Sequence, residues 1–273
     1  MVQPPGRPGV GPAGGHRRPS VRHRPGRPGG VEVSGGDLAS RLVSVQERID
    51  RAADAAGRRS ADITLIGVTK THPPALAQAA VDAGLVDLGE NRVQELVAKR
   101  DRVTGARWHL IGQLQRNKVR DIVGAQILVH SMDRRRLADA LSRRAAEAGT
   151  VQRVLVQVNV GDDPAKGGCE VDGTLELVAY ARDLPNLTIE GLMTIPPLPP
   201  TGADPVESTR PHFATLRRLR DACRERYPEV MHLSMGMSGD LEAAVAEGAT
   251  MVRVGTSLFG TRADGPWRPQ EDG

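Results

Sequence analysis

Short apolar runs alternate with segments of helical periodicity along most of this 273-residue chain. Between the runs, apolar side chains recur at helical spacing, as in Leu137 and Leu141. Strands that alternate with helices form parallel βα units, and eight such units close into a barrel. The sequence therefore predicts an α/β protein with a (β/α)8 TIM barrel. The eight predicted strands lie within residues 63–69, 85–89, 108–112, 127–130, 154–160, 188–194, 231–235 and 251–255.

A doubly wound open sheet is the alternative arrangement for the same alternation. Open sheets that bind dinucleotides carry a glycine-rich turn directly after the first strand. Residues 69–73, which follow the first predicted strand, contain no glycine. The missing turn and the count of eight favour the barrel over the open sheet.

The ends of the chain differ in composition from its centre. Residues 1–36 hold seven of the 20 prolines and ten of the 31 glycines and have no apolar periodicity, which predicts disorder. A translation start assigned too far upstream would also explain this segment. Apolar residues recur at helical spacing from Asp37 onward, and Gly57 ends that helix. We expect a disordered basic tail at 1–36, a barrel domain at 37–262 and a polar tail at 263–273.

The charge of the chain gives no sign of a nucleic-acid partner. Its net charge is +4, but residues 1–36 carry six arginines and one glutamate, so the remainder carries 4 − 5 = −1. Only six aromatic residues are available to stack on bases. Two cysteines, Cys169 and Cys223, form no disulfide framework, and no apolar run is long enough to span a bilayer. We expect a cytoplasmic protein that binds neither nucleic acid nor membrane.

Lys70 is the first candidate for covalent chemistry. It closes the first predicted strand and is one of four lysines, against thirty-three arginines. Only a primary amine condenses with an aldehyde, which a guanidinium does not replace. In a barrel, residues at the carboxyl ends of strands form the functional site. The alternative is an ordinary solvated lysine at a strand end.

Other strand ends carry further candidates. Asn91 follows the second predicted strand, either in the site or as the N-cap of the next helix. The histidines of the chain lack the spacing of a zinc site, so we expect no metal. The turns after the seventh and eighth strands combine glycines, hydroxyls and one arginine, a composition that suits a phosphate group. Either turn alone would be an ordinary βα connection. The residues concerned are Ser234, Gly236, Met237, Ser238, Arg253, Gly255 and Thr256. Together with Lys70 they indicate a phosphate-bearing aldehyde.

Six motifs, in order, resemble those of the pyridoxal phosphate homeostasis proteins: VTKTHP at 68–73, GEN at 89–91, WHLIGQLQRNK at 108–118, GLMT at 191–194, SMGMS at 234–238 and RVGT at 253–256. The resemblance extends over about residues 37–262 and implies a TIM barrel of the alanine racemase N-terminal domain type. That family binds pyridoxal 5′-phosphate (PLP) without an established catalytic activity.

The resemblance also implies roles for individual residues. Lys70 would form the aldimine with PLP, and Arg253 would face the pyridine nitrogen. Asn91 and Met193 would line the ring. The phosphate would be held by the two glycine-bearing turns, that is by Gly236, Met237 and Ser238 together with Gly255 and Thr256, and Ser234 belongs to the same site. The implied function is PLP homeostasis by a monomer that buffers the cofactor or delivers it to apo-enzymes as transient acceptors.

The chemistry of such a site agrees with a carrier. We expect burial at the barrel mouth, with Arg253 nearby, to favour the neutral amine of Lys70 that reacts with an aldehyde. An arginine opposite the pyridine nitrogen keeps that nitrogen unprotonated and weakens the ring as an electron sink.

Two enzymatic alternatives remain open. A PLP-dependent amino-acid racemase needs a second base on the opposite face of the ring, and neither Tyr180 nor Tyr227 is convincingly placed for this role. A Schiff-base aldolase acting on a sugar phosphate is the other alternative. The visible absorbance of bound PLP distinguishes this aldolase from both the carrier and the racemase.

The basic tail should be dispensable. Residues 1–36 cannot bury enough apolar surface to offset the entropy lost on ordering. We expect a chain lacking them to keep the melting temperature and the PLP affinity of the full-length protein. A clear loss of either quantity would show that the tail packs on the barrel.

Overall fold

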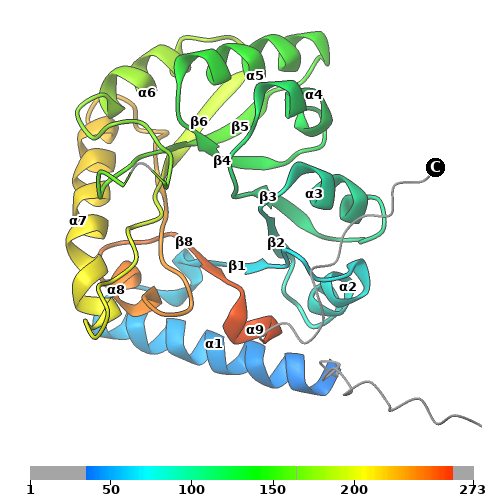
Figure 1. Cartoon of the computed structure of the whole chain (residues 1–273), viewed down its shortest axis with the longest axis vertical. Coiled ribbons are helices and arrows are strands. Elements are labelled where there is room, and N and C mark those ends of the chain that lie inside the picture. The colour runs from blue at the N-terminus through cyan, green and yellow to red at the C-terminus, as the bar shows by residue number, and fades with distance from the viewer. Residues whose placement is uncertain (1–34, 164, 261–273) are drawn as a thin grey trace, which may run out of the picture. The chain divides into compact units, whose positions relative to one another are not determined.

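Eight parallel strands form a closed barrel in the computed structural model of the protein, which describes residues 35–163 and 165–260 (Figure 1). Consecutive strands are neighbours throughout, and β1 (Thr64–Val68) also pairs with β8 (Met251–Val254), which closes the ring. The predicted barrel is therefore confirmed, and the open sheet is excluded. The other strands, each within or overlapping a predicted run, are β2 (Asp87–Glu90), β3 (Arg107–Leu110), β4 (Leu128–Met132), β5 (Gln152–Gln157), β6 (Leu187–Met193) and β7 (His232–Ser234).

Helices connect the strands on the outside of the barrel (Figure 1). Short 3-10 turns at Ser60–Asp62 and Arg116–Lys118 precede β1 and α4. The α-helices of the described residues are α1 (Gly35–Ala55), α2 (Pro74–Asp82), α3 (Val93–Arg100), α4 (Val119–Ile122), α5 (Arg135–Glu147), α6 (Thr174–Arg182), α7 (Pro205–Arg224), α8 (Leu241–Ala246) and α9 (Thr256–Phe259). None of these described helices is long and apolar enough to cross a bilayer.

The expected lead-in helix is α1, and it packs beside α8 and α9 (Figure 1). Its buried residues Leu38, Val45 and Ile49 recur at helical spacing. The helix ends just before Gly57, which has a φ of +64° that suits glycine. It begins at Gly35, two residues before the predicted boundary. The rest of the predicted tails, 1–34 and 263–273, lies outside the described residues.

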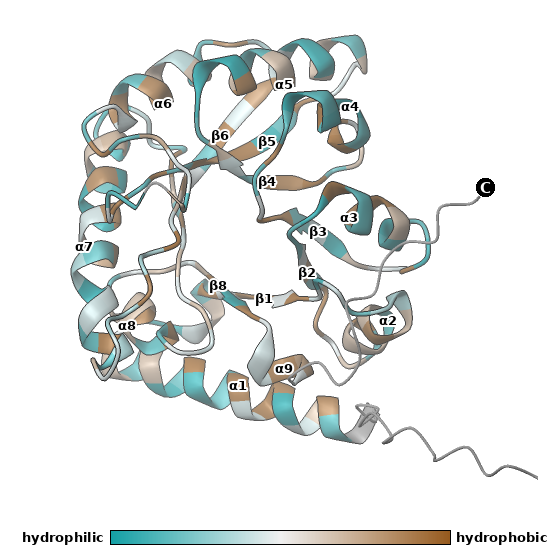
Figure 2. Cartoon of the chain, viewed as in Figure 1, coloured by the Kyte–Doolittle hydropathy of each residue, from teal (hydrophilic) through white to brown (hydrophobic). Residues whose placement is uncertain are grey.

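Two hydrophobic cores hold the barrel together. The larger core fills the layer between strands and helices, and Figure 2 shows hydrophobic residues along β4 and β5 with mixed hydropathy along the helices. The smaller core lies inside the barrel. Successive side chains of a strand point to opposite faces, so Leu65 belongs to the outer core while Ile66 and Val68 belong to the inner one. The inner core comprises Ile66, Val68, Ile111, Leu128, Leu155, Met193 and Met251.

Candidate functional site

The barrel brings the predicted site residues to the carboxyl ends of neighbouring strands. Lys70 follows β1, Asn91 follows β2, and Met193 and Ser234 are the last residues of β6 and β7. Because β8 lies between β7 and β1, the turns after these three strands are adjacent. The Arg253 N–H donates to the Gly236 carbonyl at 3.0 Å, which joins the eighth strand to the turn after the seventh.

Lys70 is exposed, so the expectation that it is buried at the mouth is wrong. The residues on either side of Lys70 fix the backbone of the turn Thr69–Thr71. Thr69 is fully buried, and Thr71 has a φ of +65°, in the left-handed region that non-glycine residues rarely adopt. The Thr71 N–H donates to Glu95 Oε2 at 2.6 Å. The strained turn thus presents the Lys70 amine to solvent from a fixed backbone.

A buried ion pair lies directly beneath this turn, and the sequence analysis missed it. Lys99 of α3 is fully buried, and its Nζ donates to Glu90 Oε1 at 2.6 Å and to the Thr69 carbonyl at 2.7 Å. Thr69 Oγ1 also donates to Glu90 Oε1, at 2.6 Å. Burial raises the pKa of Glu90, and the Lys99 ion pair and the Thr69 hydrogen bond oppose that rise. The pair therefore anchors the backbone that carries Lys70.

Arg253 places a fixed cation inside the mouth. Its side chain is buried, and its guanidinium donates to Ser234 Oγ at 2.7 Å and to the Thr194 carbonyl at 2.8 Å. Burial lowers the pKa of Arg253 to about 10, so the group stays charged at neutral pH. A guanidinium held by two protein acceptors has little freedom to move. It can contact a ring nitrogen without reorganisation.

The turn after β7 has a constrained backbone. Gly236 has a φ of +90°, and a Cβ there would lie 2.4 Å from the Ala244 Cβ, so only glycine fits. The Met237 N–H is bonded to Asp240 Oδ1, at 2.6 Å. Among the described residues, no hydrogen bond engages the backbone N–H of Ser238 or Gly239. Those two amides, rather than that of Met237, are open to an anion.

Helix α1 steadies this turn from outside. Arg48 donates to the Ser238 carbonyl at 3.0 Å and pairs with Glu242 of α8 at 2.8 Å. Burial raises the pKa of Asp240 within the same turn. These contacts hold the turn and leave the backbone N–H groups of Ser238 and Gly239 without a partner among the described residues.

Asn91 is half-buried and does not cap the helix that follows it. The N-cap of α3 is Arg92, and no side chain caps it, so the capping alternative is wrong. The backbone here is tightly packed, because a Cβ on Gly112 would lie 2.1 Å from the Asn91 carbonyl oxygen. Met193 is fully buried in the inner core.

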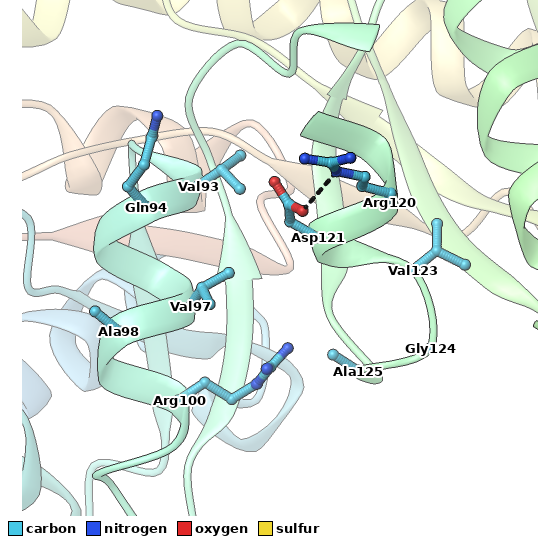
Figure 3. A pocket seen from close by; sticks show the side chains of 10 residues that line it. All are labelled: Val93, Gln94, Val97, Ala98, Arg100, Arg120, Asp121, Val123, Gly124 and Ala125. Carbon is cyan, nitrogen blue, oxygen red and sulfur yellow. Dashed lines mark hydrogen bonds and ion pairs between the residues drawn. The ribbon is translucent and has the colours of Figure 1, made fainter. Parts of the chain in front are cut away.

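The histidines of β3 and β4 lie in the interior, and one cavity lies apart from the predicted site residues. His109 and His130 are buried and hydrogen-bonded to each other at 3.0 Å, as satisfied interior groups. Within the described ranges, no group of three or more His, Cys, Asp or Glu residues is arranged to hold a metal ion. A cavity of about 850 Å³ opens between α3 and α4, where Val93 and Val97 face Asp121 (Figure 3). It contains none of the predicted site residues.

The residues of the mouth suit a phosphate-bearing aromatic aldehyde. They provide one exposed primary amine, one buried guanidinium and a glycine turn with available amides and hydroxyls. Lys70 is the exposed one of the four lysines, since Lys99 is buried and Lys118 and Lys166 are half-buried. Amine, cation and anion-binding turn all lie at the ends of three adjacent strands.

Comparisons with known proteins identify the family. Residues 42–263 match the alanine racemase N-terminal domain. The pyridoxal phosphate homeostasis protein of Aquifex aeolicus is 46% identical over 229 residues, which cover 83% of this chain and 99% of that protein. Its counterpart in Escherichia coli K12 is 41% identical over 235 residues, covering 83% and 97%.

Solved structures agree. PipY of Synechococcus elongatus PCC7942, solved with PLP bound, is 36% identical, has a TM-score of 0.70 and is matched over 82% of this chain and 100% of its own. An alanine racemase of Clostridium difficile 630 shares the fold at 17% identity and a TM-score of 0.66, and is matched over only 60% of its length. The chain therefore belongs to the alanine racemase N-terminal domain family and, within it, to the pyridoxal phosphate homeostasis proteins.

Proposed function

We propose that this protein binds PLP at the mouth of the barrel and acts in intracellular PLP homeostasis, buffering the cofactor or delivering it. The observation that carries the proposal is the exposed amine of Lys70 at the carboxyl end of β1, the strand that pairs with β8, which carries the buried Arg253. The names of the curated relatives and the PLP-bound PipY structure support it.

Lys70 attaches the cofactor in this proposal. Condensation of its neutral amine with the aldehyde forms a carbon–nitrogen double bond and releases water, and attack by water or another amine reverses the step. The exposure of Lys70 suits reversible loading, because solvent and an acceptor can reach the bond. The anchored Thr69–Thr71 turn holds the amine in one place during exchange.

The other residues recognise the two ends of the molecule. The turns at Gly236–Ser238 and Gly255–Thr256 receive the phosphate, in part through the amides of Ser238 and Gly239. Arg253 faces the pyridine nitrogen and, as a charged donor, keeps it unprotonated. Asn91 and Met193 line the ring. We further propose a cytoplasmic monomer whose acceptors are PLP-dependent apo-enzymes.

Neither tyrosine of the chain supports the racemase alternative. The Tyr180 hydroxyl, on α6, donates to Asp139 of α5 at 2.6 Å, and both helices lie outside the barrel. Tyr227 follows α7, where the Arg182 guanidinium lies 4.8 Å from its ring centroid. Neither hydroxyl is placed as a second base at the mouth.

Delivery is tested by transfer. PLP-loaded protein, freed of excess cofactor by gel filtration, is mixed with a PLP-dependent apo-enzyme while a trap removes free PLP. We expect the apo-enzyme to regain activity faster than with an equal amount of free PLP under the same trap. Equal or slower reactivation would contradict delivery and leave only storage.

We expect no useful turnover of amino acids, even with the site saturated. Two-base racemisation needs a proton acceptor on each ring face, and a positioned acceptor contributes about 10²–10⁴-fold to rate. The measurement is incubation with single L- and D-amino acids in deuterated water, following α-proton exchange and the opposite enantiomer. Multiple turnovers that disappear in Lys70→Ala would establish the racemase instead. Slow exchange without inversion would not, because one lysine on one face can exchange a proton.

A further inference from the structure

A continuous row of buried polar groups crosses the inside of the barrel and ends on Arg253. It begins with Asp87 at the start of β2 and passes through His109 of β3 and His130 of β4 to Ser234 of β7. The distances are 3.1 Å from Asp87 Oδ1 to His109 Nε2, 3.0 Å from His109 Nδ1 to His130 Nε2 and 2.9 Å from His130 Nδ1 to Ser234 Oγ. The last bond is the 2.7 Å contact from Arg253 to Ser234 Oγ.

The chemistry of the two ends fixes the protons between them. Burial alone would raise the pKa of Asp87, but hydrogen bonds from His109 and Arg107 lower it to about 2, so it is a carboxylate that only accepts. A neutral His109 imidazole therefore donates from Nε2 and accepts at Nδ1. His130 then donates from Nε2 and accepts at Nδ1 from the Ser234 hydroxyl.

The opposite order is unfavourable at the Asp87 end. It would set an unprotonated nitrogen of His109 against the Asp87 carboxylate, and the Ser234 hydroxyl would accept from both His130 and Arg253. Charging His130 is also disfavoured, because burial lowers its pKa well below 6.5, and His109, Arg253 and His232 nearby add to the effect. The charged groups at the Asp87 end are Asp87 and Arg107, which are paired with each other, and Arg100 and Arg153, which line the same cavity.

We propose that His109 and His130 are positioning residues for Arg253 and couple it to Asp87 at the amino-terminal end of the barrel. His130 accepts a hydrogen bond from the Ser234 hydroxyl. This bond turns the Ser234 lone pairs toward Arg253 and so holds the guanidinium. The consequence for the cofactor rests on the proposed function, in which Arg253 faces the pyridine ring. Asp87 lines a cavity of about 700 Å³ together with Arg107, His109 and His232. A change at Asp87 then alters the environment of the cofactor at the other end of the row.

The proton order is tested without cofactor, on the full chain labelled with nitrogen-15 at histidine. Long-range nitrogen–proton spectra at neutral pH should show His109 and His130 both protonated at Nε2 and unprotonated at Nδ1. Single His109→Gln and His130→Gln variants assign the signals. A proton on Nδ1 of His130, or a charged imidazole at either position, overturns the inference even if PLP binds.

The coupling is tested with variants that do not touch the mouth. We expect Asp87→Asn and His109→Leu to weaken PLP binding about tenfold, as for a hydrogen bond to a charged group, and to shift the absorbance maximum or pH profile of the visible band. Two controls change the same cavity outside the row. Arg153→Gln removes a cavity arginine that pairs with Glu190 and not with Asp87, and His232→Gln removes a histidine bonded to Thr250.

The controls should keep the affinity and the spectrum of the wild-type protein. Unchanged spectra in Asp87→Asn and His109→Leu, or equal shifts in the controls, overturn the coupling. If His109→Leu does not fold, Asp87→Asn decides alone, because it keeps the shape of the side chain. A wild-type protein that binds no PLP contradicts the proposed function, whereas the proton order in the cofactor-free protein is judged separately.

Discussion

Replacing Lys70 by alanine or arginine abolishes the visible absorbance band that forms when PLP is added to the protein. The arginine variant keeps the charge, but a guanidinium does not condense with an aldehyde under these conditions. Because Lys70 is exposed, neither substitution removes a buried contact, and we expect an unchanged melting temperature. Absorbance titration with PLP and thermal unfolding of the same samples measure the two effects.

The attachment site is read directly by reduction. Borohydride converts the bond between PLP and its lysine into a stable amine, and peptide mapping then locates the label, which we expect on Lys70. The matched control is Lys118→Arg, at a half-buried lysine in the 3-10 turn before α4, and it should retain the band. A principal label on Lys99, Lys118 or Lys166 would show that the assignment of Lys70 is wrong.

The periodicity of the sequence was sufficient to predict the barrel and the residues that end its strands. Strand β4 is buried at every position and β5 at all but one, because both of their faces are covered, and eight such strands between helices leave few other topologies. Since functional residues lie at strand ends, the positions of Lys70, Asn91 and Arg253 follow from the order of the strands alone. Local pattern carries this information.

Features that depend on three-dimensional packing could not be predicted in this way. Glu95 and Lys99 are four residues apart on a helix, a pattern typical of a solvated ion pair, yet α3 turns both side chains inward beneath Thr69. The bond between His130 and Ser234 joins residues 104 positions apart, so it exists only once the barrel has closed. The exposure of Lys70 likewise depends on how the mouth is covered, which periodicity does not encode.

Lys99→Met should lower the free energy of unfolding by about 3–5 kcal/mol, because it leaves the carboxylate of Glu90 buried without its charged partner. Both side chains are fully buried, and Glu90 Oε2 has no hydrogen-bond partner among the described residues. Urea unfolding of the variant and the wild type measures the difference. Lys118→Met is the matched control, and we expect it to stay within about 0.5 kcal/mol of the wild type, as substitutions away from buried features do.

Removing the second charge separates the ion pair from simple loss of packing. In the Lys99→Met/Glu90→Gln double variant no buried charge is left unpaired, so most of the lost stability should return. The deficit of Lys99→Met alone should also shrink toward acidic pH. Burial raises the pKa of Glu90 in the folded state, so the folded protein takes up a proton more readily than the unfolded chain and gains stability as the pH falls toward the unfolded value. A double variant as unstable as Lys99→Met, with a deficit independent of pH, would mean that Lys99 acts through packing alone and that its charge does not anchor the turn carrying Lys70.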